Sequence, residues 1–147
     1  MSAVWTSALP FFPEHELWCK HCKLIKLDLD FAAQITALRS KWAQPLTPNS
    51  CCRCTPHNTA EGGHPNSLHL MENPKHKTAG TMAMDIRWRP WESGEKLKFA
   101  RLAHSMGFRV GLHDGFCHVD LGVKIGLPHK PFLYGTWSAP FKSEDIF

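Results

Sequence analysis

Two short segments with alternating apolar and polar residues constrain the fold of this chain most. In residues 81–88 one face of the alternation is entirely apolar: Met82, Met84, Ile86 and Trp88. The other face carries Asp85. Residues 116–121 repeat the alternation, with Cys117 on the apolar face and His118 and Asp120 on the polar one. This period of two predicts two β-strands, each with its apolar face in the core.

Helical periodicity predicts two helices beside these strands. Over residues 30–42 apolar side chains recur at helical spacing: Phe31, Ile35, Leu38 and Trp42. Asp28 and Asp30 are candidate caps of this helix. A second stripe lies in residues 93–106, between Ser93 as candidate N-cap and Gly107 at the C-terminal end: Phe99, Leu102, Ala103 and Met106. With a further short strand at residues 109–112, we expect an α+β fold, in which a small, mainly antiparallel sheet is flanked by helices.

The length and composition of the chain favour one domain over residues 1–147. Residues 1–18 are predicted to form an N-terminal arm, since Pro10 and Pro13 interrupt regular structure. Residues 123–147 are rich in proline and aromatic residues and are predicted to form a tail that wraps over the body. No run of about 20 apolar residues predicts a membrane helix. The net charge of +4, without a basic cluster interleaved with aromatics, argues against a nucleic-acid partner.

The polar faces of the two strands are candidates for metal chemistry. Asp85 and His118 both lie on the face opposite the core, and polar groups that become buried there must be paired or bind a metal. Ten histidines in 147 residues also favour a metal site. The alternative is that both residues face solvent on two edge strands. The alternation by itself leaves both interpretations open.

Four of the six cysteines have the spacing of a structural zinc site. Cys19-x-x-Cys22 and Cys51-x-x-Cys54 together offer four thiolates. The alternative, which we prefer from the sequence, is that Cys51 and Cys54 are small core residues near Arg53 and that Cys19 and Cys22 are free thiols. No secretory leader is recognisable in the sequence, so we expect synthesis in a cytosol and reduced or metal-bound cysteines.

An ordered series of motifs resembles a family of zinc peptidases. The series is Arg53, His57-Asn58, Gly62-Gly63, Ser67-x-His69, Ala83-x-Asp85 and Phe116-x-His118-x-Asp120. In this order the chain resembles the D-Ala-D-Ala carboxypeptidases and L-alanyl-D-glutamate endopeptidases, whose fold is similar to that of the hedgehog signalling domain. The resemblance covers about residues 24–122. It implies zinc-dependent hydrolysis of an amide bond in peptidoglycan stem peptides.

The resemblance also implies roles for single residues. The zinc ligands are matched by His69, Asp85 and His118. Two imidazoles and one carboxylate leave a fourth position open, which distinguishes a catalytic zinc from a structural one. Arg53 matches the arginine that holds a substrate carboxylate or carbonyl oxygen and stabilises the developing oxyanion. Ser67 matches a serine that supports a ligand or contacts the substrate.

The chain departs from the family pattern at two places. Asp85 follows His69 at a greater distance than in the family, so residues 70–81 are an inserted loop, and His76 within it is a rival ligand. Many relatives carry an acidic general base three positions before the last histidine, where this chain has Gly115. The candidate bases are then Asp120, which we prefer because it shares a strand face with His118, and Asp114. The alternative role of Asp120 is to orient a ligand histidine.

The expected cofactor is one catalytic Zn²⁺ and the expected partner is peptidoglycan. Together with the missing leader, the resemblance favours a bacteriophage origin. The protein would be an endolysin that leaves the host cytoplasm for the cell wall, or a wall-degrading part of the virion that contacts other virion proteins. The alternative function is a non-catalytic structural or binding module of the virion that retains the peptidase fold, which the glycine at Gly115 favours.

Overall fold

The computed structural model describes residues 3–147, and Met1 and Ser2 of the predicted arm lie outside them. Its centre is a sheet of five strands in the order β3-β4-β6-β5-β7. The strand bounds are Thr47–Ser50 for β3, Ala83–Arg87 for β4, Arg109–Leu112 for β5, Phe116–Asp120 for β6 and Phe132–Leu133 for β7. All neighbours are antiparallel except β5 and β7, which are parallel. A separate pair joins β1 (Val4–Trp5) to β2 (Leu27–Asp28).

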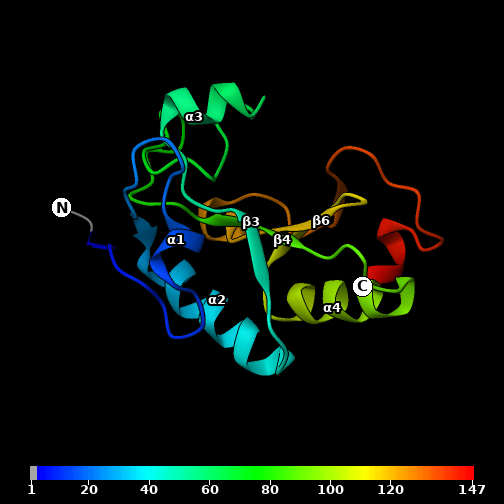
Figure 1. The fold of residues 1–147 in the computed structure, drawn as a ribbon. Coiled ribbons are helices and arrows are strands. Elements are labelled where there is room, and N and C mark those ends of the chain that lie inside the picture. Colours follow the sequence, from blue (N-terminus) through cyan, green and yellow to red (C-terminus); the bar gives the residue numbers. More distant parts are fainter. Residues whose placement is uncertain (1–2) are drawn as a thin grey trace.

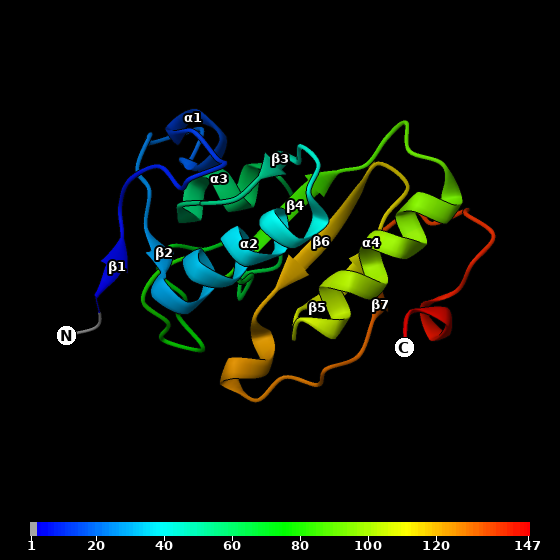
Figure 2. The ribbon, with the colours of Figure 1, turned by 90° about the horizontal axis from the view of Figure 1, so that it is seen from below.

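Two long helices, α2 (Leu29–Trp42) and α4 (Ser93–Ser105), lie on the same face of the sheet (Figures 1 and 2). The Asp28 carboxylate caps α2 by accepting a hydrogen bond from the Phe31 N–H at 2.9 Å. Beyond α4, Gly107 has a φ of +93°, as a helix C-terminus requires. The predicted α+β class, with a small and mainly antiparallel sheet beside helices, is therefore confirmed.

Aromatic side chains fill the space between these helices and the sheet. Trp42 of α2 stacks on Trp91 at 5.5 Å between ring centroids and packs edge-on against Phe99 of α4. Trp88 and Phe99 are completely buried. The apolar stripes that predicted the two helices thus form this core, and the sheet is held rigidly on one face while its other face carries the site. No helix in residues 3–147 has the length and apolar character needed to span a membrane.

Several local predictions were wrong or incomplete. The first residue of α4 is Ser93, and Glu92 is its N-cap, without a side-chain hydrogen bond. The arm contains β1 and the short helix α1 (Glu14–Leu17), and the cysteine-rich segment after α2 contains β3 and the helix α3 (Thr55–Ala60). The tail contains two short 3₁₀ helices, η1 (Gly122–Ile125) and η2 (Ser143–Ile146), and its strand β7 extends the sheet. These elements have two to six residues, too few for periodicity to predict them.

Candidate metal centre

The register of the sheet brings the two strand ligands together. Asp85 in β4 is the direct partner of His118 in β6. Both side chains project from the face opposite α2 and α4, and both are buried, with exposed fractions of 3% and 4%. The Asp85 Oδ1 atom lies 2.9 Å from His118 Nδ1. The alternative interpretation, in which these residues face solvent on edge strands, is therefore excluded.

His69 approaches the same carboxylate from the loop between α3 and β4. Its Nε2 atom lies 3.1 Å from Asp85 Oδ1. Its backbone is fixed by the Ser67 hydroxyl, which accepts from the His69 N–H at 3.2 Å, and by the Thr81 hydroxyl, which donates to the His69 carbonyl at 2.8 Å. His76, the rival ligand, lies elsewhere in the loop, where its N–H donates to Asn73. The ligand atoms of His69, Asp85 and His118 all lie within 4.8 Å of one another.

The hydrogen bonds of His69 show that this group fits a cation. Its Nδ1 atom lies 2.8 Å from the Cys51 carbonyl oxygen, which only accepts, so Nδ1 carries the proton of the neutral ring. Nε2 then carries a lone pair that is buried and has no hydrogen-bond partner among residues 3–147. It faces the Asp85 carboxylate, which is also an acceptor. A metal cation between these two acceptors would satisfy both, and the set of two imidazoles and one carboxylate suits zinc.

Asp120 holds the far side of the His118 ring. Its Oδ2 atom lies 2.7 Å from His118 Nε2, and its Oδ1 atom accepts from the Gly122 N–H at 2.8 Å. Burial lowers the pKa of His118, but the carboxylates of Asp120 and Asp85 outweigh it and raise that pKa to about 9. The His118 ring thus lies between two carboxylates, with Nδ1 facing Asp85 and Nε2 facing Asp120.

Arg53 forms the wall next to Asp85. Its Nη2 donates to Asp85 Oδ2 at 3.3 Å, its Nη1 to Asn58 Oδ1 at 3.2 Å and its Nε to the Ser50 hydroxyl at 3.0 Å. Burial raises the pKa of Asp85, but the charges and hydrogen bonds of His69 and His118 outweigh it and hold that pKa well below its ordinary value. A Cβ on Gly63 would overlap Asn58 Oδ1, which explains the second glycine of the Gly62-Gly63 motif.

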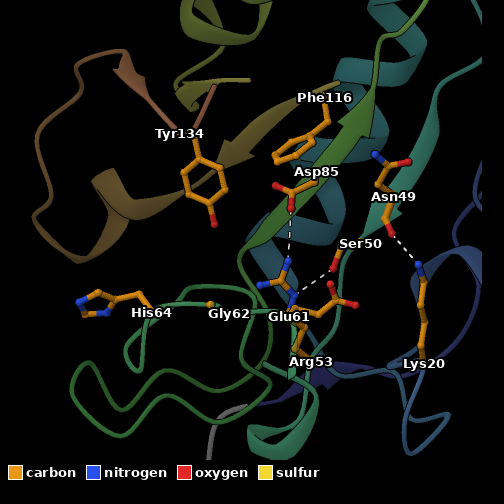
Figure 3. A pocket seen from close by; sticks show the side chains of 12 residues that line it. Lys20, Asn49, Ser50, Arg53, Glu61, Gly62, His64, Asp85, Phe116 and Tyr134 are labelled. Atoms are coloured by element: carbon orange, nitrogen blue, oxygen red, sulfur yellow. Dashed lines mark hydrogen bonds and ion pairs between the residues drawn. The ribbon is translucent and has the colours of Figure 1, made fainter. Parts of the chain in front are cut away.

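Tyr134 is a site residue that the sequence did not reveal. Directly after β7, its ring stacks on the His118 imidazole at 4.4 Å between centroids. Its hydroxyl points toward Arg53 and Asp85 (Figure 3). Burial and the nearby Asp85 charge raise the pKa of Tyr134 to about 12, so the hydroxyl keeps its proton and can donate. Tyr134 is the chain's one tyrosine, which was the available signal, but nothing in the tail predicted that it returns to the sheet.

A cavity of about 520 Å³ opens in front of these groups (Figure 3). Asp85, Arg53 and Tyr134 line its inner part, and Lys20, Glu61 and His64 line its rim. The Lys20 ammonium is held by the Asn49 carbonyl oxygen at 2.8 Å. The candidate metal-binding group therefore meets an open cavity at Asp85, and this cavity is lined by hydrogen-bond donors and cations.

The structure does not bring Asp114 to this cavity. Asp114 lies in the turn between β5 and β6, where its carboxylate accepts from the N–H and the hydroxyl of Ser138 at 2.8 and 2.9 Å. The structure also does not assemble the four cysteines whose spacing is typical of a structural zinc site. The sulfurs of Cys19, Cys22 and Cys54 lie close together, but Cys51 is not part of this group. The catalytic roles of Asp120, Asp114 and Arg53, and a substrate contact by Ser67, stay predictions.

Comparison with known proteins agrees with the motifs and the geometry. Searches among curated proteins and solved structures found no match to the chain. A family model described as Peptidase M15 matches residues 15–120, which include His69, Asp85, His118 and Arg53. Peptidases of this family are zinc-dependent. With most of its length matched, the chain belongs to the Peptidase M15 family.

Proposed function

We propose that this protein is a zinc peptidase that hydrolyses an amide bond in peptidoglycan stem peptides. The observation that carries the proposal is the convergence of His69, Asp85 and His118 on one point, where Asp85 lines an open cavity beside Arg53. A structural zinc would be enclosed by four protein ligands, whereas this set has three, and its Asp85 faces a cavity large enough for part of a peptide.

The cavity suits a substrate that carries carboxylates. Three of the five N–H groups of Arg53 are engaged by Asp85, Asn58 and Ser50, and the other two remain for a substrate oxygen. The Tyr134 hydroxyl supplies a neutral donor on the same side, and Lys20 adds a cation at the rim. Stem peptides contain free carboxylates and peptide carbonyls, and these are the groups such donors hold.

His69, Asp85 and His118 would hold the zinc ion, which when bound supplies Lewis acidity that activates water and polarises a carbonyl at neutral pH. Asp120 keeps the proton of His118 on Nε2 and so leaves Nδ1 free to act as a ligand. Arg53 and Tyr134 donate to the oxygen on which negative charge develops during attack. Because these donors are held by buried contacts, they need little reorganisation during the reaction.

The experiment is digestion of purified stem peptides with the zinc-loaded protein, followed by mass spectrometry of the products. We expect new amino and carboxyl termini at one amide bond, no cleavage by His69→Ala, and loss of cleavage with a chelator that is reversed by zinc. Intact peptides in the presence of a zinc-loaded, folded protein would refute the proposal. If such a protein still bound the peptides, the alternative function as a non-catalytic binding module would be supported instead.

We further propose that the biological substrate is the cell wall of a bacterial host and that the protein acts as a bacteriophage endolysin or a virion-associated hydrolase. The resemblance of its motifs to wall peptidases supports this role. Loss of turbidity of isolated cell walls, compared between wild type and His69→Ala, tests it.

A further inference from the structure

A second group of metal-ligating side chains lies beside the Arg53 segment. The sulfur atoms of Cys19, Cys22 and Cys54 all lie within 4.8 Å of one another. The sulfurs of Cys19 and Cys54 are 3.6 Å apart, and His21 Nδ1 lies 3.4 Å from the Cys54 sulfur. These residues come from two segments that are distant in the sequence, so the fold assembles the group.

Two distances in this group match those of a tetrahedral zinc site. With Zn–S bonds near 2.3 Å and Zn–N bonds near 2.0 Å, two sulfur ligands lie about 3.8 Å apart and a sulfur and a nitrogen about 3.5 Å apart. The observed separations of 3.6 and 3.4 Å agree with both values. The cysteines are free thiols, and their sulfurs are spaced to share one ion.

The backbone around Cys19 is shaped as a tight turn that presents its sulfur. The Cys19 carbonyl accepts from the Lys23 N–H at 2.7 Å, and the Cys19 N–H donates to the Leu24 carbonyl at 2.9 Å. Lys23 has a φ of +62°, a left-handed conformation that is uncommon outside glycine and indicates that the turn is closely constrained. The Cys54 N–H points at the Cys19 sulfur at 3.4 Å.

These N–H groups favour the thiolate, the form that binds metal. Burial raises the pKa of the Cys19 thiol, but the N–H groups of Cys22, Cys54 and His21 outweigh it, and that pKa lies below its ordinary value. Cys51, in contrast, is 2% exposed, and its sulfur is not part of the group whose members lie within 4.8 Å of one another. The fourth ligand is therefore sought at His21 and not at Cys51.

We propose that Cys19, Cys22 and Cys54 hold a structural zinc ion, separate from the catalytic one, and that the exposed His21, which already lies next to the Cys54 sulfur, turns in as the fourth ligand. Thiolates select a soft ion of tetrahedral preference, and four protein ligands leave no open position for chemistry. The ion would tie the turn that carries Lys20 to the residue that directly follows Arg53. Since Lys20 and Arg53 both line the cavity, the second ion would fix two substrate-facing cations relative to each other.

Cobalt substitution tests this site independently of peptidase activity. Full-length protein is purified with reductant, stripped of metal and titrated with Co²⁺. We expect a thiolate-to-cobalt charge-transfer absorption, because the group of His69, Asp85 and His118 contains no sulfur. Elemental analysis of the zinc-loaded protein should give two ions per chain. The variant Cys22→Ser should lose the absorption and one zinc, whereas the matched control Cys51→Ala should keep both.

Two further results decide the proposal. His69→Ala should lose one zinc and keep the charge-transfer absorption, which separates this site from the catalytic one. His21→Ala should change the visible cobalt spectrum while the charge-transfer absorption stays, and an unchanged spectrum would exclude His21 as a ligand. Wild-type protein that is folded and reduced but shows no charge-transfer absorption would overturn the proposal. A Cys19–Cys54 disulfide in protein purified without reductant, with no metal bound under either condition, would also overturn it.

Discussion

Replacing Asp120 by asparagine separates the two roles that are open to this carboxylate. In the wild type, Asp120 Oδ2 accepts from His118 Nε2 at 2.7 Å and Oδ1 accepts from the Gly122 N–H at 2.8 Å. An asparagine can keep only one of these bonds as an acceptor. If its oxygen stays on Gly122, its NH₂ group faces His118 Nε2 and forces the ring proton onto Nδ1, where it blocks the metal.

The expected loss follows from this contact. Mutation of a carboxylate that orients a ligand histidine typically weakens metal binding about 10- to 100-fold, or about 1.4–2.8 kcal/mol. Zinc affinity should be measured by competition with a chromophoric chelator at about pH 9, where the raised pKa of His118 leaves little proton competition. Asp30→Asn, which changes an exposed carboxylate bonded to Lys124, is the matched control and should bind zinc as the wild type does.

Kinetics at saturating zinc complete the test. If Asp120 orients His118, kcat should stay within about tenfold of the wild type once zinc is saturating. A general base at Asp120 would instead give unchanged zinc affinity and a kcat that is about 10²–10⁴-fold lower at any zinc concentration. That second pattern would refute the orienting role, and Asp114→Asn measured in parallel shows whether Asp114 behaves as a base.

Three more predictions address the cavity wall and its charge. Arg53→Lys should lower the free energy of unfolding by about 2–4 kcal/mol, because an ammonium lacks the planar fork of donors that reaches Asp85, Asn58 and Ser50 at once; denaturant titration beside the exposed control Arg87→Lys measures it. Tyr134→Phe should keep its stack on the ligand ring and its zinc, yet lower kcat/KM about 10²-fold, and an unchanged kcat/KM in steady-state assays would contradict the donor role. Because the pKa of His118 is raised to about 9, a proton competes with zinc below that pH, so zinc affinity should rise about tenfold per pH unit from neutral pH upward; a flat titration series would be the contrary result.

The sequence predicted the frame of the site well, because the relevant patterns are local. Alternation predicted β4 and β6 with Asp85 and His118 on the face opposite the core, and the apolar stripes predicted α2 and α4 to within a residue or two. Burial acts on every residue of such an element, so the period of its apolar residues records its structure. The ordered motifs then supplied the family and the choice of His69.

The sequence was weaker where a residue's role depends on contacts with distant segments. It placed Asp120 on the strand face of His118 but left its role open, and only the structure shows its carboxylate behind the ring. It offered Asp114 as a base, although the turn between β5 and β6 directs that carboxylate to Ser138. It missed Tyr134, because a strand of two residues, β7, carries no readable period.

The sequence by itself determined the fold class, the two strands that carry the candidate metal ligands Asp85 and His118, the two helices behind them and the family. Tertiary structure alone decided that Asp85 lies opposite His118, that Tyr134 returns from the tail to cover the His118 ring, and that His21 lies beside the Cys54 sulfur while Cys51 stays outside the cysteine group. The physical reason is the range of the interactions. Periodicity reports which side of an element is buried, whereas register, chain reversal and side-chain direction depend on which distant segments pack together.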